Sequence, residues 1–154
     1  MEEFVSNFTN KIDAKGRVSV PASFRAVLTV EQSDEIFCHP ALDGPALDAG
    51  GPRLVKHIRG LLEELAPYSD EKDQLATALF GESEYLKIDS DGRIVLPQRL
   101  RDVVGLTNAV TFVGLGDKFQ IWEPAQFEKA RQEARSKVRD LRALLGQAKG
   151  RAND

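Results

Sequence analysis

The sequence predicts an α+β protein made of two similar units, each consisting of a β-hairpin, a short helix and a second β-hairpin. The main observation is a phrase that occurs twice, "KIDAKGRVSVPASFR" at residues 11–25 and "KIDSDGRIVLPQRLR" at residues 87–101. Each copy also holds, in the same order, the signals of a tight turn, an alternating strand and a helix start. One such unit of about 50 residues has a small core and open sheet edges. We therefore expect the two units to pair about a pseudo-twofold axis and to share one core, with further helices flanking it.

Each copy begins with a hairpin turn whose residues have defined roles. In "DAKG", Asp13 is expected to accept hydrogen bonds from the backbone ahead of it. Gly16 is expected to supply the positive φ that closes a three-residue loop with a bulge. Asp89 and Gly92 occupy the same places in "DSDG". These four residues predict two loops of the same shape.

A strand and then a helix follow each turn. In "RVSV" the valines Val18 and Val20 alternate with polar residues, which places them toward the core. Proline fits the first turn of a helix, where its missing N–H is not needed, so Pro21 and Pro97 mark helix starts. We expect each helix to bury one apolar face, formed by Phe24, Val27 and Leu28 in the first copy and by Leu100, Val103 and Val104 in the second.

A second hairpin and a longer helix complete each unit. "AVTFVGLGDKFQIWEP" is typical of two strands around a Gly-rich turn, whereas the first copy offers a strand at 36–39 and a turn near Asp43. Because "ALDAGGP" lacks an aromatic strand end like "IWEP", we expect this hairpin of the first copy to be irregular. Helical spacing predicts helices over 52–65 and 125–147, the second with a heptad-like series (Phe127, Ala134, Val138, Leu141, Leu145). The expected organisation is repeat 1 at 7–54, a helical connector at 55–82, repeat 2 at 83–126, and a C-terminal helix and tail at 127–154.

Composition and charge limit the class of protein. No apolar run approaches the roughly 20 residues of a membrane span, and the N-terminus lacks the features of a signal peptide. The single cysteine, Cys38, excludes an internal disulfide, so we expect a cytoplasmic protein. A net charge of −3 and a pI of about 5.5 argue, taken alone, against a nucleic-acid partner. Acidic residues are concentrated outside the repeated phrase, which leaves room for a locally positive surface.

The candidate functional residues are the basic side chains of the two loops. Arg17 and Arg93 each begin the strand just past the glycine, on the face that the core does not use. Arginine presents five fixed donors that suit phosphate oxygens and the edge of guanine, and a β-ribbon can enter the major groove. Asp91 stands where the first copy has Lys15, so the first loop is expected to be the stronger anion site. We predict that DNA is contacted by Lys15, Arg17 and Arg93, in loops shaped by Asp13, Gly16, Asp89 and Gly92.

Other interpretations remain open from the sequence. Each Asp–Arg pair, four residues apart across a hairpin, can simply pair and stiffen its turn. Arg25 and Arg101 also recur, and they either dock onto carboxylates of the paired half or contact DNA. As a whole, the protein can instead be an enzyme with Asp13 and Asp89 as a symmetric carboxylate pair, or a scaffold that recruits a partner through its C-terminal helix.

The sequence predicts no catalytic residue, no cofactor and no metal site. Against the enzyme, each Asp is followed by a Gly-Arg that would keep it ionised. His39 and His57 lack metal-like neighbours, and phosphate-binding glycine loops and nucleophile elbows are absent.

The doubled phrase closely resembles the two D-x-x-x-R motifs of the MraZ family of bacterial transcriptional regulators. The resemblance covers nearly the full length, including the helix after each unit. It implies two SpoVT/AbrB-like swapped-hairpin units that form one β-barrel core, and it assigns Asp13 with Arg17 and Asp89 with Arg93 to the motifs. It also implies binding to double-stranded promoter DNA of the division and cell-wall gene cluster, including the regulator's own gene. A ring-like homo-oligomer associated with the nucleoid, and with no membrane, is the implied state.

Overall fold

The computed structural model describes the backbone of residues 2–153 and the side chains of residues 2–147. The chain forms two compact units, Met1–Pro124 and Ala125–Asp154. The first unit contains both copies of the repeated phrase. Its first half comprises β1 (Asn7–Lys11), β2 (Arg17–Ser19), α1 (Ala22–Val30), β3 (Glu35–Pro40) and β4 (Leu47–Gly50). Its second half comprises β5 (Glu84–Lys87), β6 (Arg93–Val95), α4 (Gln98–Val104), β7 (Ala109–Gly114) and β8 (Phe119–Trp122).

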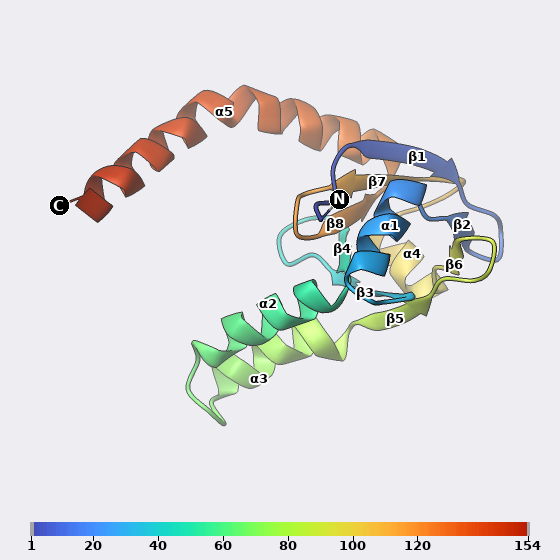
Figure 1. Ribbon diagram of the computed structural model, residues 1–154, viewed down its shortest axis with the longest axis horizontal. Helices are drawn as coiled ribbons and strands as arrows, with labels where there is room; N and C mark the ends of the chain where they lie inside the picture. The colour runs from blue at the N-terminus through green and yellow to red at the C-terminus, as the bar shows by residue number, and fades with distance from the viewer. Residues whose placement is uncertain (1, 154) are drawn as a thin grey trace. The chain divides into compact units, whose positions relative to one another are not determined.

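Strands of the two halves pair with each other at four places, β1 with β7, β2 with β6, β3 with β5 and β4 with β8 (Figure 1). A six-stranded sheet has the order β1-β7-β8-β4-β3-β5, and a two-stranded sheet is formed by β2 and β6. Within the six-stranded sheet, β1 pairs with β7 of the other half and β5 pairs with β3 of the other half. All of these pairings are antiparallel. The expected α+β class, with strands of both copies in shared sheets, is confirmed.

The second hairpin of the first copy is regular, so the expectation of an irregular hairpin was wrong. β3 and β4 pair over four residues, from Phe37 opposite Gly50 to Pro40 opposite Leu47. The other edge of β4 pairs with β8, where Leu47 lies opposite Ile121. Since β4 is an interior strand buried along its whole length, partners on both sides hold it regular without an aromatic end.

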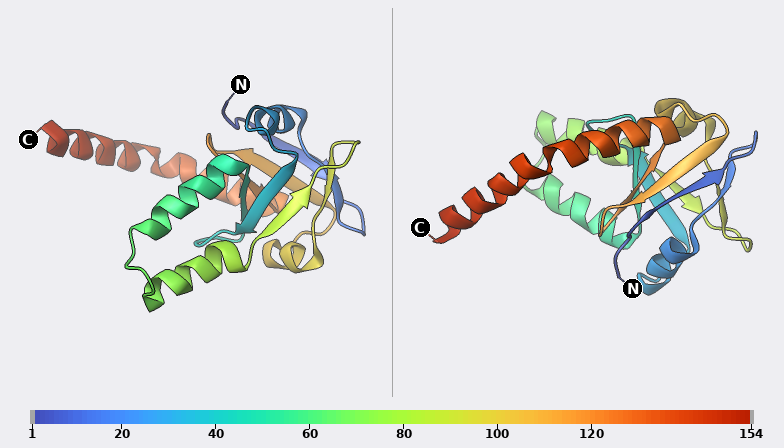
Figure 2. Two further views of the ribbon diagram at one scale, coloured as in Figure 1. Left: turned by 60° about the horizontal axis from the view of Figure 1, so that its bottom comes forward. Right: turned by 90° about the horizontal axis from the view of Figure 1, so that it is seen from above.

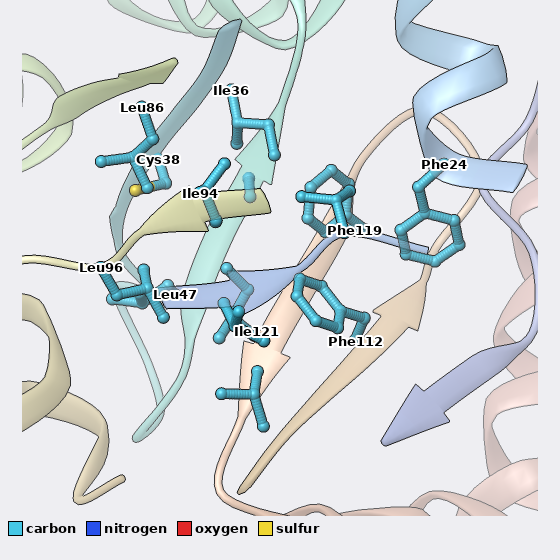
Figure 3. Close-up of a cluster of buried hydrophobic side chains, with 14 of the residues drawn as sticks. Phe24, Ile36, Cys38, Leu47, Leu86, Ile94, Leu96, Phe112, Phe119 and Ile121 are labelled. Carbon is cyan, nitrogen blue, oxygen red and sulfur yellow. The ribbon is translucent and has the colours of Figure 1, made fainter. Parts of the chain in front are cut away.

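The core lies between the sheets and the two short helices (Figure 3). Phe24 of α1 packs against Phe112 and Phe119, with ring centroids 6.4 and 5.0 Å away. The ring of Phe4 completes this cluster 4.9 Å from Phe119, a contact that the sequence did not indicate. Val103, expected in the core, is 44% exposed, because the seven-residue helix α4 buries only one residue per turn.

A helical connector and a long C-terminal helix complete the chain. The connector comprises α2 (Pro52–Glu63), α3 (Asp70–Ala76) and a π-helical turn, η1 (Thr77–Gly81). Figure 2 shows α2 and α3 side by side, and together with η1 they cover Phe37 on the outer side of β3. The second compact unit contains α5 (Pro124–Asn153) except for its first residue. No helix among the described residues combines the length and apolarity that crossing a membrane requires.

Candidate nucleic-acid interface

The two repeated strands form a small ribbon that has one buried and one exposed face. β2 and β6 pair antiparallel, with Val18 opposite Ile94 on the buried face. On the exposed face Arg17 lies opposite Val95, and Ser19 lies opposite Arg93. The two arginines are therefore diagonal neighbours, with Cα atoms about 7–8 Å apart. The loops that precede the strands project at the same end of the unit (Figures 1 and 2).

Loop one, Asp13–Gly16, is organised by its aspartate. Asp13 Oδ1 accepts hydrogen bonds of 2.9 Å from the backbone N–H groups of Lys15 and Arg17. Asp13 Oδ2 accepts a 2.7 Å bond from Nε of Arg17. Gly16 has a φ of +87°. Both expected roles, the accepting aspartate and the left-handed glycine, are confirmed.

Loop two, Asp89–Gly92, has the same backbone hydrogen bonds and left-handed glycine as loop one, but a different charge. Asp89 Oδ1 accepts from the N–H groups of Asp91 and Arg93 at 2.9 and 3.0 Å, and Gly92 has a φ of +78°. Arg93 lies between two carboxylates, with Nε 3.4 Å from Asp89 Oδ2 and Nη2 3.3 Å from Asp91 Oδ2. Its buried Nε makes no hydrogen bond of good geometry.

The two arginines consequently differ in what they can offer to an anion. Arg17 uses Nε for Asp13, and within the part of the chain that the structure describes its terminal Nη groups meet no partner. Arg93 has a second carboxylate, that of Asp91, on one of its terminal nitrogens. Lys15 is exposed in loop one, where Asp91 is exposed in loop two. Loop one therefore presents more positive charge to solvent.

The loop hydrogen bonds also keep the aspartates ionised. The backbone N–H and then the side chain of Arg17 hold the pKa of Asp13 below its usual 3.8. The pKa of Asp89 is lowered for the same reason, first by the N–H of Arg93. Each aspartate is bonded within its own loop, and among the described side chains no hydrogen bond or ion pair joins the two. A proton-sharing dyad needs two carboxylates in contact, one of them with a raised pKa. Here the two carboxylates bond to separate loops, and both pKa values are lowered.

Arg25 and Arg101 dock onto backbone rather than onto carboxylates. Nε of Arg101 donates to Leu96 O at 3.0 Å, and its Nη1 donates to Ala14 O of loop one at 3.3 Å. Nε of Arg25 donates to Val20 O at 3.2 Å. The sequence left open whether these arginines dock onto the protein or contact DNA. In this structure they dock onto the protein, but their partners are backbone carbonyls, so the expected carboxylate partners were wrong. The only sequence signal for this contact was that an arginine recurs four residues after each proline.

The remaining polar candidates form no other site. His39 is buried and its Nδ1 lies 2.8 Å from Pro40 O. Cys38 is buried in the core, where desolvation raises the pKa of its thiol to about 12. Among the described residues, no group of three or more His, Cys, Asp or Glu side chains is arranged to hold a metal ion.

Comparison of the sequence with known proteins shows which family the chain belongs to. The sequence model described as "MraZ protein, putative antitoxin-like" matches residues 79–145. The protein named transcriptional regulator MraZ of Methylocella silvestris is 54% identical over 145 residues, which cover 94% of this chain and 88% of the relative.

Two further relatives carry the same name. That of Beijerinckia indica is 53% identical, again over 94% of this chain and 88% of its own length. That of Azorhizobium caulinodans is 49% identical over 97% of this chain and 96% of its own length. This is a family of transcriptional regulators and not of enzymes, so the carboxylate-pair enzyme is excluded. With about half of the residues identical over nearly its whole length, the chain belongs to the MraZ family.

Proposed function

We propose that this protein is a sequence-specific transcriptional regulator that binds double-stranded promoter DNA through the exposed face of the β2–β6 ribbon. Arg17 and Lys15 of the first copy make the main contacts, and Arg93 assists. The observation that carries the proposal is that both repeated arginines lie on one exposed face of a ribbon built from both copies. A two-stranded ribbon fits the major groove, which is about 12 Å wide.

The ion pairs within the loops are compatible with this role. Exposed ion pairs are worth only about 0–1 kcal/mol, so an arginine held by one is easily shared with a phosphate or a guanine. The Asp13–Arg17 bond uses Nε and leaves the forked end of the guanidinium for a ligand. Asp13 therefore orients the Arg17 side chain without occupying its terminal N–H donors.

The fold in this proposal is a swapped-hairpin barrel of two SpoVT/AbrB-like units. The supporting observation is that β1 and β5 each pair with a strand of the opposite half. The unit boundaries we propose are 7–54 and 83–126, with a helical connector at 55–82 and a C-terminal segment at 127–154.

The promoter we propose is that of the division and cell-wall gene cluster, including the regulator's own gene, which places the protein at the nucleoid. This rests on family resemblance, and no effector or cofactor is part of the proposal.

The regulator acts as a homo-oligomer in this proposal, with a ring as the expected form. One chain offers three basic loop side chains and is acidic as a whole, so several copies are needed to build affinity through effective concentration. Helix α5 supports this, because its apolar face (Val138, Leu141, Leu144 and Leu145) is 42–71% exposed. A monomer mass in sedimentation at micromolar concentration and moderate salt would contradict it.

The DNA contact is tested by binding of the full chain to DNA from upstream of its own gene, over a salt series. Arg17→Ala should weaken binding by about 1–3 kcal/mol per protomer if the contact is bidentate to a base. Lys15→Ala should weaken all DNA sequences alike and reduce the slope of log K against log salt by about one, as loss of one phosphate contact does. Arg59→Ala is the charge-matched control, because Arg59 is exposed on α2. Wild-type affinity of Arg17→Ala, with an unchanged melting temperature, would refute the proposal.

A further inference from the structure

Each DNA-contacting loop lies against an arginine from the other half of the protein. The guanidinium of Arg101, on α4, covers Gly16 at the end of loop one. A Cβ on Gly16 would lie 3.1 Å from Nε and 3.2 Å from Cζ of Arg101. Reciprocally, Arg25 on α1 covers Gly92 of loop two, where a Cβ would lie 2.9 Å from both Nε and Cζ.

Backbone hydrogen bonds reinforce the crossed arrangement. Leu96 donates its N–H to Gly16 O at 2.8 Å, and Val20 donates its N–H to Gly92 O at 2.9 Å. Arg101 then bonds to Leu96 O, and Arg25 bonds to Val20 O. Each arginine is thus fixed on the carbonyl of the same residue whose N–H holds the opposite loop.

The two contacts are not equal. Arg101 makes a second bond, from Nη1 to Ala14 O inside loop one. The corresponding bond from Arg25 to Ser90 of loop two is absent in the described part of the chain. Loop one is therefore held by one more hydrogen bond than loop two. It also carries Lys15, and its arginine, Arg17, pairs with one carboxylate whereas Arg93 lies between two.

We propose that Arg101 and Arg25 are positioning residues for DNA binding, each holding the DNA-contacting loop of the opposite half in its binding conformation. This rests on the DNA contact proposed above. Because loop one carries most of the binding, the arginine that matters more is Arg101, although it lies in the second copy. The guanidinium acts through its fixed fork of donors, a geometry that a lysine ammonium does not reproduce.

The test uses Arg→Lys variants of the full chain, which keep the positive charge and remove the fork. Arg101→Lys should weaken operator binding about fivefold, the equivalent of one net hydrogen bond, and Arg25→Lys should weaken it less than twofold. In an Arg17→Ala background, Arg101→Lys should have a clearly smaller further effect, because only the contact of Lys15 is left for it to position. In an Arg93→Ala background, it should keep its full effect. Binding is measured well below the melting temperature of each variant.

This pattern distinguishes positioning from the other roles of an arginine. If Arg101 contacts DNA itself, or only stabilises the fold, Arg101→Lys weakens DNA binding by the same factor in the Arg17→Ala and Arg93→Ala backgrounds. That result would show that the proposal is wrong. It is also wrong if Arg101→Lys binds DNA as the wild type does, or if Arg25→Lys is the more harmful variant.

A second measurement needs no DNA and separates this inference from the proposed function. Amide NMR signals of Lys15 and Arg17 should shift in Arg101→Lys, while those of Asp91 and Arg93 shift in Arg25→Lys. Shifts confined to the half that carries the substitution would overturn the crossed contact. In the wild type, the Nε–H of Arg101 should exchange with water more slowly than that of exposed Arg59, so the inference stays testable if a variant fails to fold. If Arg17→Ala binds normally, the role in DNA binding falls with the proposed function, and the crossed shifts alone report the contact.

Discussion

The backbone N–H of Leu96 bonds to the carbonyl of Gly16 at 2.8 Å, and the carbonyl of Leu96 closes over the place where a side chain of Gly16 would begin. Gly16 thus has two separate reasons to be glycine, a left-handed backbone and a lack of space. The end of the first loop is fixed by a residue from the second copy. This relationship makes the repeated glycines sensitive probes of how the halves are joined.

Substitution of the glycines by alanine should therefore give a graded series. Gly16→Ala should lower the free energy of unfolding by about 3 kcal/mol, because left-handed strain of about 1–2 kcal/mol adds to a collision with backbone. Gly92→Ala should cost less, since its obstacle is the flexible side chain of Arg25. Gly105→Ala, left-handed but in open space, should show only the strain. Gly44→Ala, with no obstacle and no positive φ, should change stability by less than about 0.5 kcal/mol. Urea unfolding measures the series, and equal losses at Gly16 and Gly105 would show that the steric contact is unimportant.

One substitution in loop two, the loop with less positive charge, should strengthen its contact with DNA. Asp91→Lys gives loop two the charge of loop one and removes the carboxylate that lies 3.3 Å from Nη2 of Arg93. We expect DNA binding to tighten severalfold at low salt, with a salt slope steeper by about one. Asp43→Lys changes the net charge equally in the β3–β4 turn and is the control. If both variants tighten binding alike, only the net charge matters and loop two makes no specific contact.

Lowering the pH below the usual pKa of aspartate should weaken the hydrogen bonds that hold both loops. The pKa of Asp13 and that of Asp89 are lower in the folded protein than 3.8, so their bonds stabilise the fold above that pH. The contribution is lost as the pH falls from about 3.8 through the lowered folded-state pKa values. Wild type should be more stable than Asp13→Asn at pH 7, and the difference should shrink as the pH falls below 3.8. A difference in unfolding free energy that is constant with pH would show that the charge of Asp13 is irrelevant.

Cys38 should report global unfolding. Desolvation in the core raises the pKa of its thiol to about 12, so almost no reactive thiolate is present at pH 8. We expect a disulfide reagent to react with the native protein only as fast as the core opens, and at the rate of a free thiol in denaturant. Rapid labelling of the native protein would show that β3 opens locally.

The local parts of this protein follow from its sequence alone. Asp13 and Gly16 shape their loop through bonds within five residues of chain, and Pro21 immediately precedes a helix whose buried face comprises Phe24, Val27 and Leu28. Turn and helix signals of this kind act over a few residues, so each copy carries them in full. The repeat itself also indicated that both copies contribute to one core.

The tertiary structure alone decided what each element touches. Arg101 reaches Ala14, Phe4 closes an aromatic cluster, and β4 becomes an interior strand because β8 of the other half pairs with it. These contacts join residues far apart in the chain, and the same arginine on the same short helix is equally compatible with a carboxylate, a carbonyl or a DNA phosphate as its partner. Only the pairing of β2 with β6, which brings each short helix close to the loop of the opposite half, places the arginine over its glycine.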